Sequence, residues 1–485
     1  MVKKECKIDK KYYKLTRKGK TNYILDNKPV NNTIKKRLEN IYIPPIYKNI
    51  LLSRKNNSKI QAIVRDNKGR NQYIYHPLFT KKIENRKYKD LYPLGANINK
   101  IIRDNTLILS KLTRLSNINF NEDNLEYLLN LVIYMLLNYN FRIGSEKYEK
   151  EYNSRGITTL KNDNIFNNLN DYVKQKNILE DNELEKLKIN KLKINKLKKN
   201  KLKKEKLKKE LIRDLKILSI MDKSDKIYNK DKIIDLIILK YHSFNILDDV
   251  LNNKLNNILD DKSEKHAKFI KTKVLQNLNK LQKDNNGFII DFIGKKGMIN
   301  RMYDTNQYMY KILNRLNKNI VKNTVKNTVN HTSKNTVNKN NSNKNNIKYL
   351  FSYKKEDENN NVIENRLINS DMVQDYFDNK YKLKITPKMF RTWFANFYML
   401  KYLSSLDSNI IKTIKKNELS KKLNIYLPIY VSYKLNNTPS ICRKKYINNK
   451  LLKNIINNPK YYITKCKSCL TDENINNYLL KLLYK

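Results

Sequence analysis

The sequence predicts an α+β protein with a small β-rich N-terminal domain (residues 1–85) and a larger, mostly α domain (residues 86–485). Short segments of alternating apolar and polar residues, separated by turns, fill the first 85 positions, as is typical of half-buried strands. Beyond them, apolar residues recur at helical spacing. Two low-complexity stretches, residues 166–285 and 318–347, are expected to interrupt the larger domain as insertions.

The charge of the chain predicts a polyanionic partner. The 485 residues carry a formal net charge of +55, for which nucleic acid is the first candidate and a membrane surface the second. No apolar run is long enough to span a bilayer, and the first residues lack the apolar core of a secretion signal. Four cysteines in so long a chain fit a reducing, intracellular compartment. Part of the lysine excess is also what an AT-rich genome would produce.

In the N-terminal domain the pattern predicts two hairpins. Residues 23–30 form the first, and a strand over 61–66 returns over 72–75 after a turn. Gln72 would share one face with Ile74, while Tyr73 and Tyr75 would lie on the other. A two-stranded ribbon can enter a DNA major groove, where Gln binds adenine through two hydrogen bonds. The alternative is that the tyrosines are ordinary strand residues.

The larger domain begins with helical spacing over residues 88–114 and a strongly apolar helix over 124–138. Arg142 follows that helix directly, at a glycine-containing break. A guanidinium group there is either paired with a buried carboxylate or directed at a phosphate. Residues 156–161 are expected to form a short strand.

The first insertion contains a lysine- and leucine-rich five-residue repeat between Glu185 and Leu211. Each step of five residues rotates ~140° about a helix axis, so the leucines form no coiled-coil seam. We expect a solvated basic helix or a disordered arm that adds non-specific DNA affinity. The second insertion is polar, lacks core residues and is expected to be disordered.

After the first insertion, residues 287–297 predict a strand and a glycine turn with Lys295 near its tip. Such a lysine is either simply solvated or a mobile ammonium group delivered to a phosphate oxygen. Structure is expected to resume at 349–353, with a helix over 367–376.

A further helix is expected to start at Thr386 as N-cap with Pro387 in the first helical position. Lys388 and Arg391 would share one face of its first turn. Two cations near the positive end of the helix dipole suit a phosphate group. Trp393, next on this helix, is expected to support Arg391 in the core.

Residues 436–446 combine a polar turn, a helix start near Pro439 and a basic segment that ends in Tyr446. Tyr446 would lie about two turns into the helix, with Arg443 on the same face. A phenol has a pKa of ~10, so an attacking tyrosine needs fixed cations beside it near neutral pH. Since the chain has 34 tyrosines, a packing role is the alternative for any single one.

In chain order, these segments resemble the catalytic core of type IB DNA topoisomerases of the short poxvirus, bacterial and giant-virus kind. The resemblance covers most of the chain outside the two insertions. It is carried by five segments: Gln61–Pro77, Phe141–Lys161, Phe292–Gly297, Phe390–Trp393 and Asn437–Tyr446. The large insertion after Lys161 departs from the family, whose members have a short hairpin there; it is expected to loop out, because loop-closure entropy grows slowly with length.

The resemblance implies a catalytic role for five residues. Tyr446 would attack a phosphodiester and form a 3′-phosphotyrosyl link, and Arg142 and Arg391 would hold the non-bridging oxygens. Lys295 would protonate the leaving 5′-oxygen. Asn437 would donate an N–H where poxvirus members have a histidine. Supercoils would relax by strand swivelling, without ATP, metal or another cofactor.

The resemblance also implies double-stranded DNA as partner, bound by a monomer that clamps around it, with neither membrane nor small-molecule cofactor. The compartment would be a virion, a viral replication site or a nucleus. The expected DNA contacts combine the N-terminal ribbon with basic and tyrosine side chains: Gln72, Tyr73, Tyr75, Lys68, Arg70, Tyr148, Lys161, Lys388 and Arg443.

Two other functions remain open on the sequence. A tyrosine recombinase shares the Arg/Lys/Arg/Tyr chemistry but usually has His-x-x-Arg where this chain has Lys388-Met-Phe-Arg391. A catalytically inactive architectural DNA-binding protein would retain Tyr446 yet form no covalent adduct. Cys466 and Cys469 form a lone C-x-x-C, which falls short of the four ligands typical of zinc, so structural thiols are favoured.

Overall fold

The computed structural model describes part of the chain, in two compact units that divide between Tyr92 and Pro93, inside helix α3 (Pro77–Arg114). The described residues are 11–18, 22–25, 28–41, 43–47, 49–66, 69, 71–114, 124–168, 171–172, 174–175, 205, 211, 272, 274, 276–277, 287–306, 308–316, 349–356 and 362–484. Among their helices, none is both long and apolar enough to cross a lipid bilayer.

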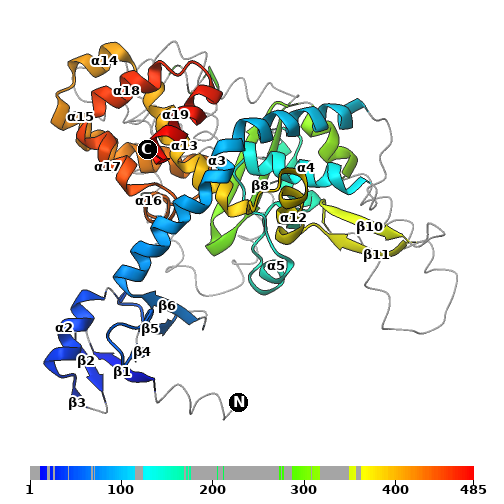
Figure 1. Cartoon of the computed structure of the whole chain (residues 1–485). Coiled ribbons are helices and arrows are strands. Elements are labelled where there is room, and N and C mark those ends of the chain that lie inside the picture. Colours follow the sequence, from blue (N-terminus) through cyan, green and yellow to red (C-terminus); the bar gives the residue numbers. More distant parts are fainter. Residues whose placement is uncertain are drawn as a thin grey trace, which may run out of the picture. The chain divides into compact units, whose positions relative to one another are not determined.

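The N-terminal unit contains a six-stranded antiparallel sheet in the order β3-β2-β1-β4-β5-β6 (Figure 1). Its elements are β1 (Tyr12–Lys18), β2 (Asn22–Leu25), β3 (Lys28–Pro29), α2 (Asn32–Asn40), β4 (Asn49–Ser53), β5 (Ile60–Arg65) and β6 (Asn71–Tyr75). Alternate strand residues such as Leu15, Leu52 and Val64 pack with Ile34 and Leu38 of α2 into its core. Both predicted hairpins are confirmed.

The ribbon of β5 and β6 has the predicted facing. Tyr73 pairs with Ile63 in the register and is 48% exposed, and Tyr75 is 38% exposed. Ile74, between them, packs on the core. Gln72 Nε2 donates to Asp66 Oδ2 at 3.1 Å. Lys68 and Arg70 lie outside the described residues.

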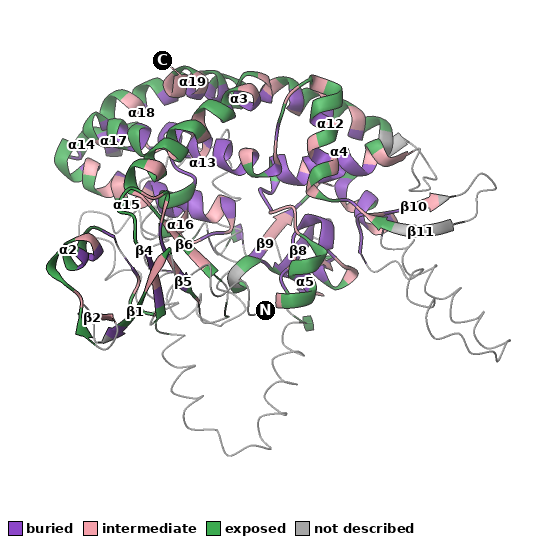
Figure 2. Ribbon diagram, turned by 60° about the horizontal axis from the view of Figure 1, so that its bottom comes forward, coloured by how far each residue is buried: buried purple, intermediate pink, exposed green. Residues whose placement is uncertain are grey.

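The larger unit is mainly helical and is built around α13 (Pro387–Ser404), most of which is buried (Figure 2). Helix α13 packs against α4, α12, α15, α18 and α19. The helices around it are α4 (Leu125–Asn138), α5 (Glu146–Tyr152), α12 (Ser370–Tyr381), α14 (Ser408–Thr413), α15 (Lys416–Leu435), α16 (Pro439–Lys445), α17 (Asn449–Asn457), α18 (Pro459–Lys467) and α19 (Asp472–Tyr484). Thr386 precedes α13 as N-cap and Pro387 opens it, as predicted.

Two small antiparallel sheets complete this unit. One has the order β7-β8-β9, and the other pairs β10 with β11. Their strands are β7 (Ile165–Phe166), β8 (Phe288–Ile293), β9 (Ile299–Asp304), β10 (Ser352–Glu356) and β11 (Val362–Leu367). The predicted glycine turn joins β8 to β9, with Gly297 at φ +72°, a left-handed conformation that glycine adopts without strain.

Two local predictions are wrong. Residues 156–161 contain a single 3₁₀ turn, Ile157–Thr159, instead of a strand. Its N–H groups at Ile157 and Thr158 donate to the carbonyl oxygens of Arg142 and Ile143, so tertiary pairing overrides the β-branched composition. The helix expected over 367–376 starts only at Ser370, because Asn369 caps it by accepting from the N–H groups of the first turn.

Only a few residues of the first insertion are described. Phe166 forms part of β7, and Tyr172 is 1% exposed, so the core continues past residue 166. Leu211 and Val274 are fully buried, which a solvated arm does not explain at these two positions. Most of 166–285 and all of 318–347 lie outside the described residues.

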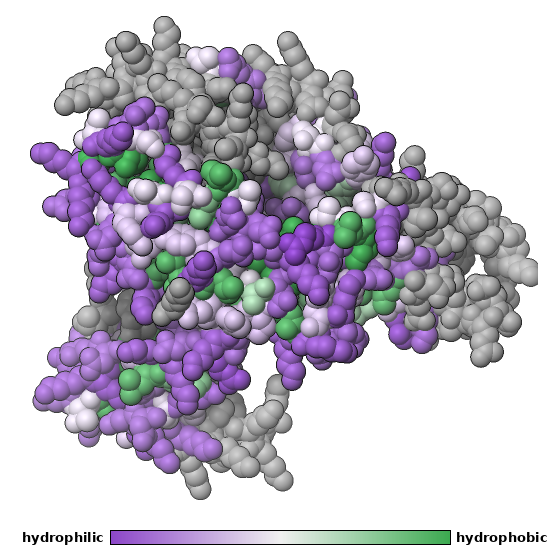
Figure 3. All heavy atoms as spheres, turned by 45° about the horizontal axis from the view of Figure 1, so that its top comes forward, coloured by the Kyte–Doolittle hydropathy of each residue, from purple (hydrophilic) through white to green (hydrophobic). Residues whose placement is uncertain are grey.

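On the face shown in Figure 3, hydrophilic side chains dominate and apolar ones form small, separate patches.

Candidate active site

Tyr446 lies immediately after α16, a helix that the sequence starts with local signals. The Thr438 hydroxyl caps it by accepting from Ile441 N at 3.2 Å, and Pro439 occupies the first turn. The backbone N–H of Tyr446 donates to Cys442 O at 3.0 Å as the helix ends. The Tyr446 side chain is only 5% exposed.

Arg142 connects two of the predicted catalytic residues. Its Nη1 donates to the Tyr446 hydroxyl at 3.2 Å, and its Nη2 donates to Asn437 Oδ1 at 2.8 Å. The break that carries Arg142 depends on Gly144 at φ +94° and on Gly156, because a Cβ on Gly156 would stand 2.5 Å from the Gly144 backbone. The predicted Arg142–Tyr446–Asn437 cluster therefore forms.

Arg391 projects from α13 and is 2% exposed. Its Nη1 donates to Asn140 O and its Nη2 to Leu435 O, the latter at 2.6 Å. Its guanidinium carbon lies 5.4 Å from the centroid of the Tyr446 ring. Two backbone carbonyls thus fix this cation against the tyrosine.

The pKa of Tyr446 lies below the ordinary tyrosine value because of these cations. Burial alone would raise the pKa, but the charges of Arg391 and Arg142 outweigh it. By contrast, burial raises the pKa of the Cys442 thiol to about 12, one turn earlier on α16. The site therefore eases ionisation of the Tyr446 hydroxyl and opposes ionisation of the Cys442 thiol.

Two buried donors of this cluster have no hydrogen-bond partner in the described part of the chain: Asn437 Nδ2 and Arg391 Nε. Asn437 is 7% exposed, and its Oδ1 is occupied by Arg142. Buried donors nearly always have a partner. An oxyanion beside Tyr446 would supply the missing acceptors.

Asn396 is a residue of the site that the sequence reasoning missed. It is fully buried on α13, and its Nδ2 donates to Tyr446 O at 3.1 Å and to Thr392 O at 2.7 Å. Its Oδ1 accepts from Asn448 N at 2.7 Å. An amide residue within the apolar run Trp393–Leu400, five positions after Arg391, was the available signal.

Lys295 lies in a short 3₁₀ turn, Lys295–Gly297, between β8 and β9. It is exposed, and its Nζ lies 5.1 Å from the centroid of the Tyr148 ring. Tyr148 belongs to α5 and is 41% exposed. The contact that the structure gives to this lysine is therefore with Tyr148, whereas Tyr446 contacts the two arginines.

The remaining predicted contact residues occupy varied surroundings. Lys161 forms an ion pair with Glu149, and Arg443 donates to Asn424 through both terminal nitrogens, at 3.2 and 2.7 Å. The expectation that Arg443 shares a face with Tyr446 is wrong, because α16 ends at Lys445. Lys388 is exposed whereas Arg391 is buried, so these two do not share one face either.

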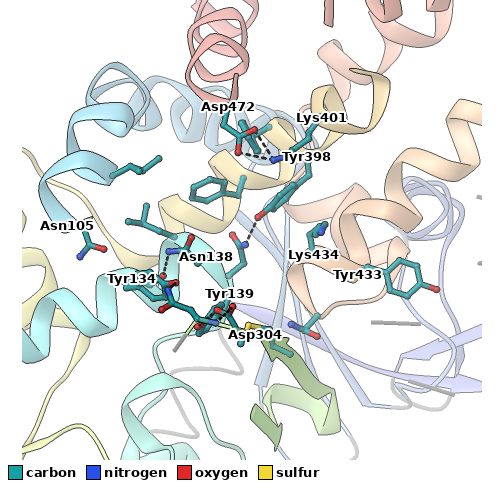
Figure 4. Close-up of a pocket in the computed structure, with 18 of the residues that line it drawn as sticks. Asn105, Tyr134, Asn138, Tyr139, Asp304, Tyr398, Lys401, Tyr433, Lys434 and Asp472 are labelled. Atoms are coloured by element: carbon teal, nitrogen blue, oxygen red, sulfur yellow. Dashed lines mark hydrogen bonds and ion pairs between the residues drawn. The ribbon is translucent and has the colours of Figure 1, made fainter. Parts of the chain in front are cut away.

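A polar pocket of about 440 Å³ adjoins this site within the larger unit (Figure 4). Asn140, whose carbonyl holds Arg391, lines it and donates from Nδ2 to the Tyr398 hydroxyl at 2.9 Å. Tyr139 donates to Asp304 at 2.7 Å, and burial together with this carboxylate raises the pKa of Tyr139. These contacts hold the backbone at Tyr139 and Asn140, whose carbonyl oxygen accepts from Arg391.

The three described cysteines, Cys442, Cys466 and Cys469, are buried thiols. Within the described ranges, no group of three or more His, Cys, Asp or Glu side chains is placed to hold a metal ion.

The site brings together the Tyr446 hydroxyl, whose pKa is lowered, two guanidinium groups and two buried N–H donors without partners in the described part of the chain. Such a set of donors can stabilise an oxyanion beside the hydroxyl. No family model matches the chain. Over 147 residues the chain is 32% identical to DNA topoisomerase 1B of Acanthamoeba polyphaga mimivirus. The match spans 30% of this chain and 40% of the length of that relative. It supports a relationship to the topoisomerase IB proteins over that part of the chain.

Proposed function

We propose that the protein is a type IB DNA topoisomerase that relaxes supercoiled DNA through a transient covalent bond to Tyr446. The observation that carries the proposal is the Tyr446 hydroxyl, held 3.2 Å from Arg142, with Arg391 against its ring and its pKa lowered. The partial similarity to a DNA topoisomerase 1B supports the same conclusion.

In the first step the Tyr446 oxygen attacks the phosphorus of a DNA strand. A P–O bond to tyrosine forms as the P–O5′ bond breaks, which gives a 3′-phosphotyrosyl link and a free 5′-hydroxyl. Arg142 and Arg391 stabilise the negative charge of the five-coordinate transition state, and Asn437 Nδ2 donates to one of its oxygens. Preorganised donors of this kind each contribute on the order of 10²–10³ in rate.

The leaving 5′-oxygen takes a proton, which Lys295 supplies. The free strand then swivels about the intact one, and the 5′-hydroxyl attacks the phosphotyrosyl bond to reseal the backbone. Each transesterification replaces one phosphoester bond by another, so the cycle needs no ATP.

DNA binding rests on charge and on the N-terminal ribbon. The chain carries 101 Lys and Arg against 46 Asp and Glu, which favours a phosphate backbone as partner. Tyr73 and Tyr75 are exposed on β6, in a ribbon that suits a major groove. Binding should weaken steeply with salt, by a log–log slope of about −0.9 for each phosphate neutralised.

The decisive experiment compares the wild type with Tyr446→Phe in plasmid relaxation with EDTA and without ATP, with covalent adducts trapped by detergent. We expect relaxation and a 3′-linked adduct in the wild type and neither in the variant. Joining of strands from separate duplexes without net relaxation would indicate a recombinase. Intact DNA binding with neither adduct nor relaxation would indicate an architectural protein.

A further inference from the structure

The Tyr148 ring is held in a fixed place. It packs on Tyr152 of the same short helix, with the ring centroids 5.7 Å apart. The next residue, Glu149, is buried, accepts from Lys161 and accepts from the Tyr349 hydroxyl at 3.0 Å. These contacts connect α5 to the segments that carry Lys161 and Tyr349. The position of the Tyr148 ring therefore does not depend on Lys295.

The turn that carries Lys295 is tied down at its base. Ile293 O accepts from Arg155 N at 2.8 Å, and Gly294 N donates to Met298 O at 2.7 Å. Only the few residues between these bonds, Lys295 among them, form the tip.

Hydrogen bonds from the segments on both sides of this turn also reach the surroundings of Tyr446. Ile157 N, two residues beyond Arg155, donates to Arg142 O at 2.9 Å, and Arg142 contacts the Tyr446 hydroxyl. On the other strand, Arg301 N donates to Asn436 Oδ1 at 3.4 Å, next to Asn437. The turn that carries Lys295 is therefore hydrogen-bonded to the same backbone segments that position Arg142 and Asn437.

A lysine side chain is long and flexible, so a proton donor on an exposed turn needs something to limit where its ammonium group goes. The face of an aromatic ring attracts an ammonium group without taking its proton. The Nζ of Lys295 lies 5.1 Å from the Tyr148 centroid, within the usual range of such contacts.

We propose that Tyr148 is a positioning residue for Lys295: its ring holds the ammonium group over α5 until Lys295 protonates the leaving 5′-oxygen. The inference rests on the proposed function. The proton passes from Nζ to O5′ as the P–O5′ bond breaks, and Lys295 is left neutral. Tyr148 acts through its ring face and makes no contact with the reacting atoms.

The test uses the full chain and two DNA duplexes that differ in one atom, with oxygen or sulfur at the bridging 5′ position. A thiolate leaves without a proton because thiols are far more acidic than alcohols, so the sulfur substrate bypasses the proton donor. Single-turnover formation of the covalent adduct is measured at saturating DNA for the wild type, Tyr148→Leu and Tyr148→Phe. Tyr461→Leu removes another exposed tyrosine, from α18, as the matched control.

We expect Tyr148→Leu to slow cleavage of the oxygen substrate about two- to fivefold, the size of an exposed cation–π contact. Cleavage of the sulfur substrate should be unchanged, Tyr148→Phe should match the wild type on both substrates, and Tyr461→Leu should do the same. Equal slowing on both substrates, a Phe variant as slow as the Leu variant, or unchanged cleavage of both substrates by Tyr148→Leu would overturn the inference. Failure of the wild type to form an adduct with either substrate would instead refute the proposed function.

Discussion

Arg142 donates from Nη2 to Asn437 Oδ1 at 2.8 Å, and this bond leaves only the Nδ2 donor of the Asn437 amide for another partner. With the oxygen engaged, the buried Nδ2 is the free end of the side chain. The pair therefore couples the Arg142 cation, which contacts the Tyr446 hydroxyl, to a neutral donor, Asn437 Nδ2. A histidine in the place of Asn437 would offer an N–H in the same role.

We predict that Asn437→Asp slows adduct formation by on the order of 10²–10³. The aspartate keeps an acceptor for Arg142 but loses the donor and places a negative charge next to the developing oxyanion. Asn437→His restores an N–H donor and should slow adduct formation less than Asn437→Asp does. Single-turnover cleavage at saturating DNA measures the effect, with DNA affinity as the control; an aspartate variant as fast as the wild type would remove Asn437 from the catalytic set.

The lowered pKa of Tyr446 predicts a pH dependence with a definite direction. The phenolate becomes populated as pH rises through the Tyr446 pKa, so cleavage should rise with pH and level off below pH ~10. Of the two arginines, Arg391 lowers the Tyr446 pKa more. Arg391→Gln therefore raises the Tyr446 pKa, and the rising limb of the pH–rate profile moves to higher pH. A pH–rate profile with the 5′-sulfur substrate isolates this limb, because that substrate leaves without a proton donor.

Arg443→Gln is the matched control for that profile, because Arg443 is exposed and donates to Asn424. Its limb should coincide with that of the wild type. If Arg391→Gln also left the limb in place, Arg391 would not be tuning the tyrosine.

Asn396 is expected to matter for both stability and rate. Asn396→Leu keeps the approximate volume but leaves Tyr446 O and Asn448 N without their partner, at a cost of about 1–3 kcal/mol for each buried group. We therefore expect a lower free energy of unfolding and slower cleavage, because the backbone of the nucleophile is no longer tied to the helix that carries Arg391. Denaturant unfolding and adduct trapping measure the two effects.

Asn138→Leu is a suitable control for Asn396, since the Asn138 side chain is exposed and its Nδ2 donates only to Tyr134 O among the bonds found for it. It should leave both quantities close to those of the wild type. A stable and fully active Asn396→Leu variant would contradict the positioning role.

Local signals explain what could be predicted from the sequence. The apolar period of residues 124–138 predicts α4, and Thr386 with Pro387 predicts the start of α13, because caps and periodicity act over a few residues. The ordered set of Arg142, Arg391, Asn437 and Tyr446 emerged from a family resemblance, and three of its contacts are direct in the structure.

Long-range pairing explains what could not be predicted. The turn at residues 157–159 is set by carbonyls of Arg142 and Ile143, so its β-branched composition misleads. Asn396 joins positions 50 residues apart, and no local pattern marks such a bond. The partner of Lys161 is likewise set by packing, because Glu149 lies on α5, 12 residues earlier in the chain.

The Lys161–Glu149 pair yields a prediction that separates a structural role from DNA contact. The side chains are 18% and 7% exposed, and Glu149 also accepts from the Tyr349 hydroxyl. Lys161→Met leaves a buried carboxylate without its cation and should lower the free energy of unfolding by about 3–5 kcal/mol.

The same variant should leave the salt dependence of DNA binding unchanged, because Glu149 already neutralises this lysine. Lys161→Met combined with Glu149→Gln should regain part of the lost stability, since no unpaired charge then remains buried. Denaturant unfolding of the single and double variants, with DNA titrations at several salt concentrations, measures both quantities. Unchanged stability with a salt slope smaller by about 0.9 would show instead that Lys161 contacts a phosphate and that its pairing with Glu149 gives way to DNA.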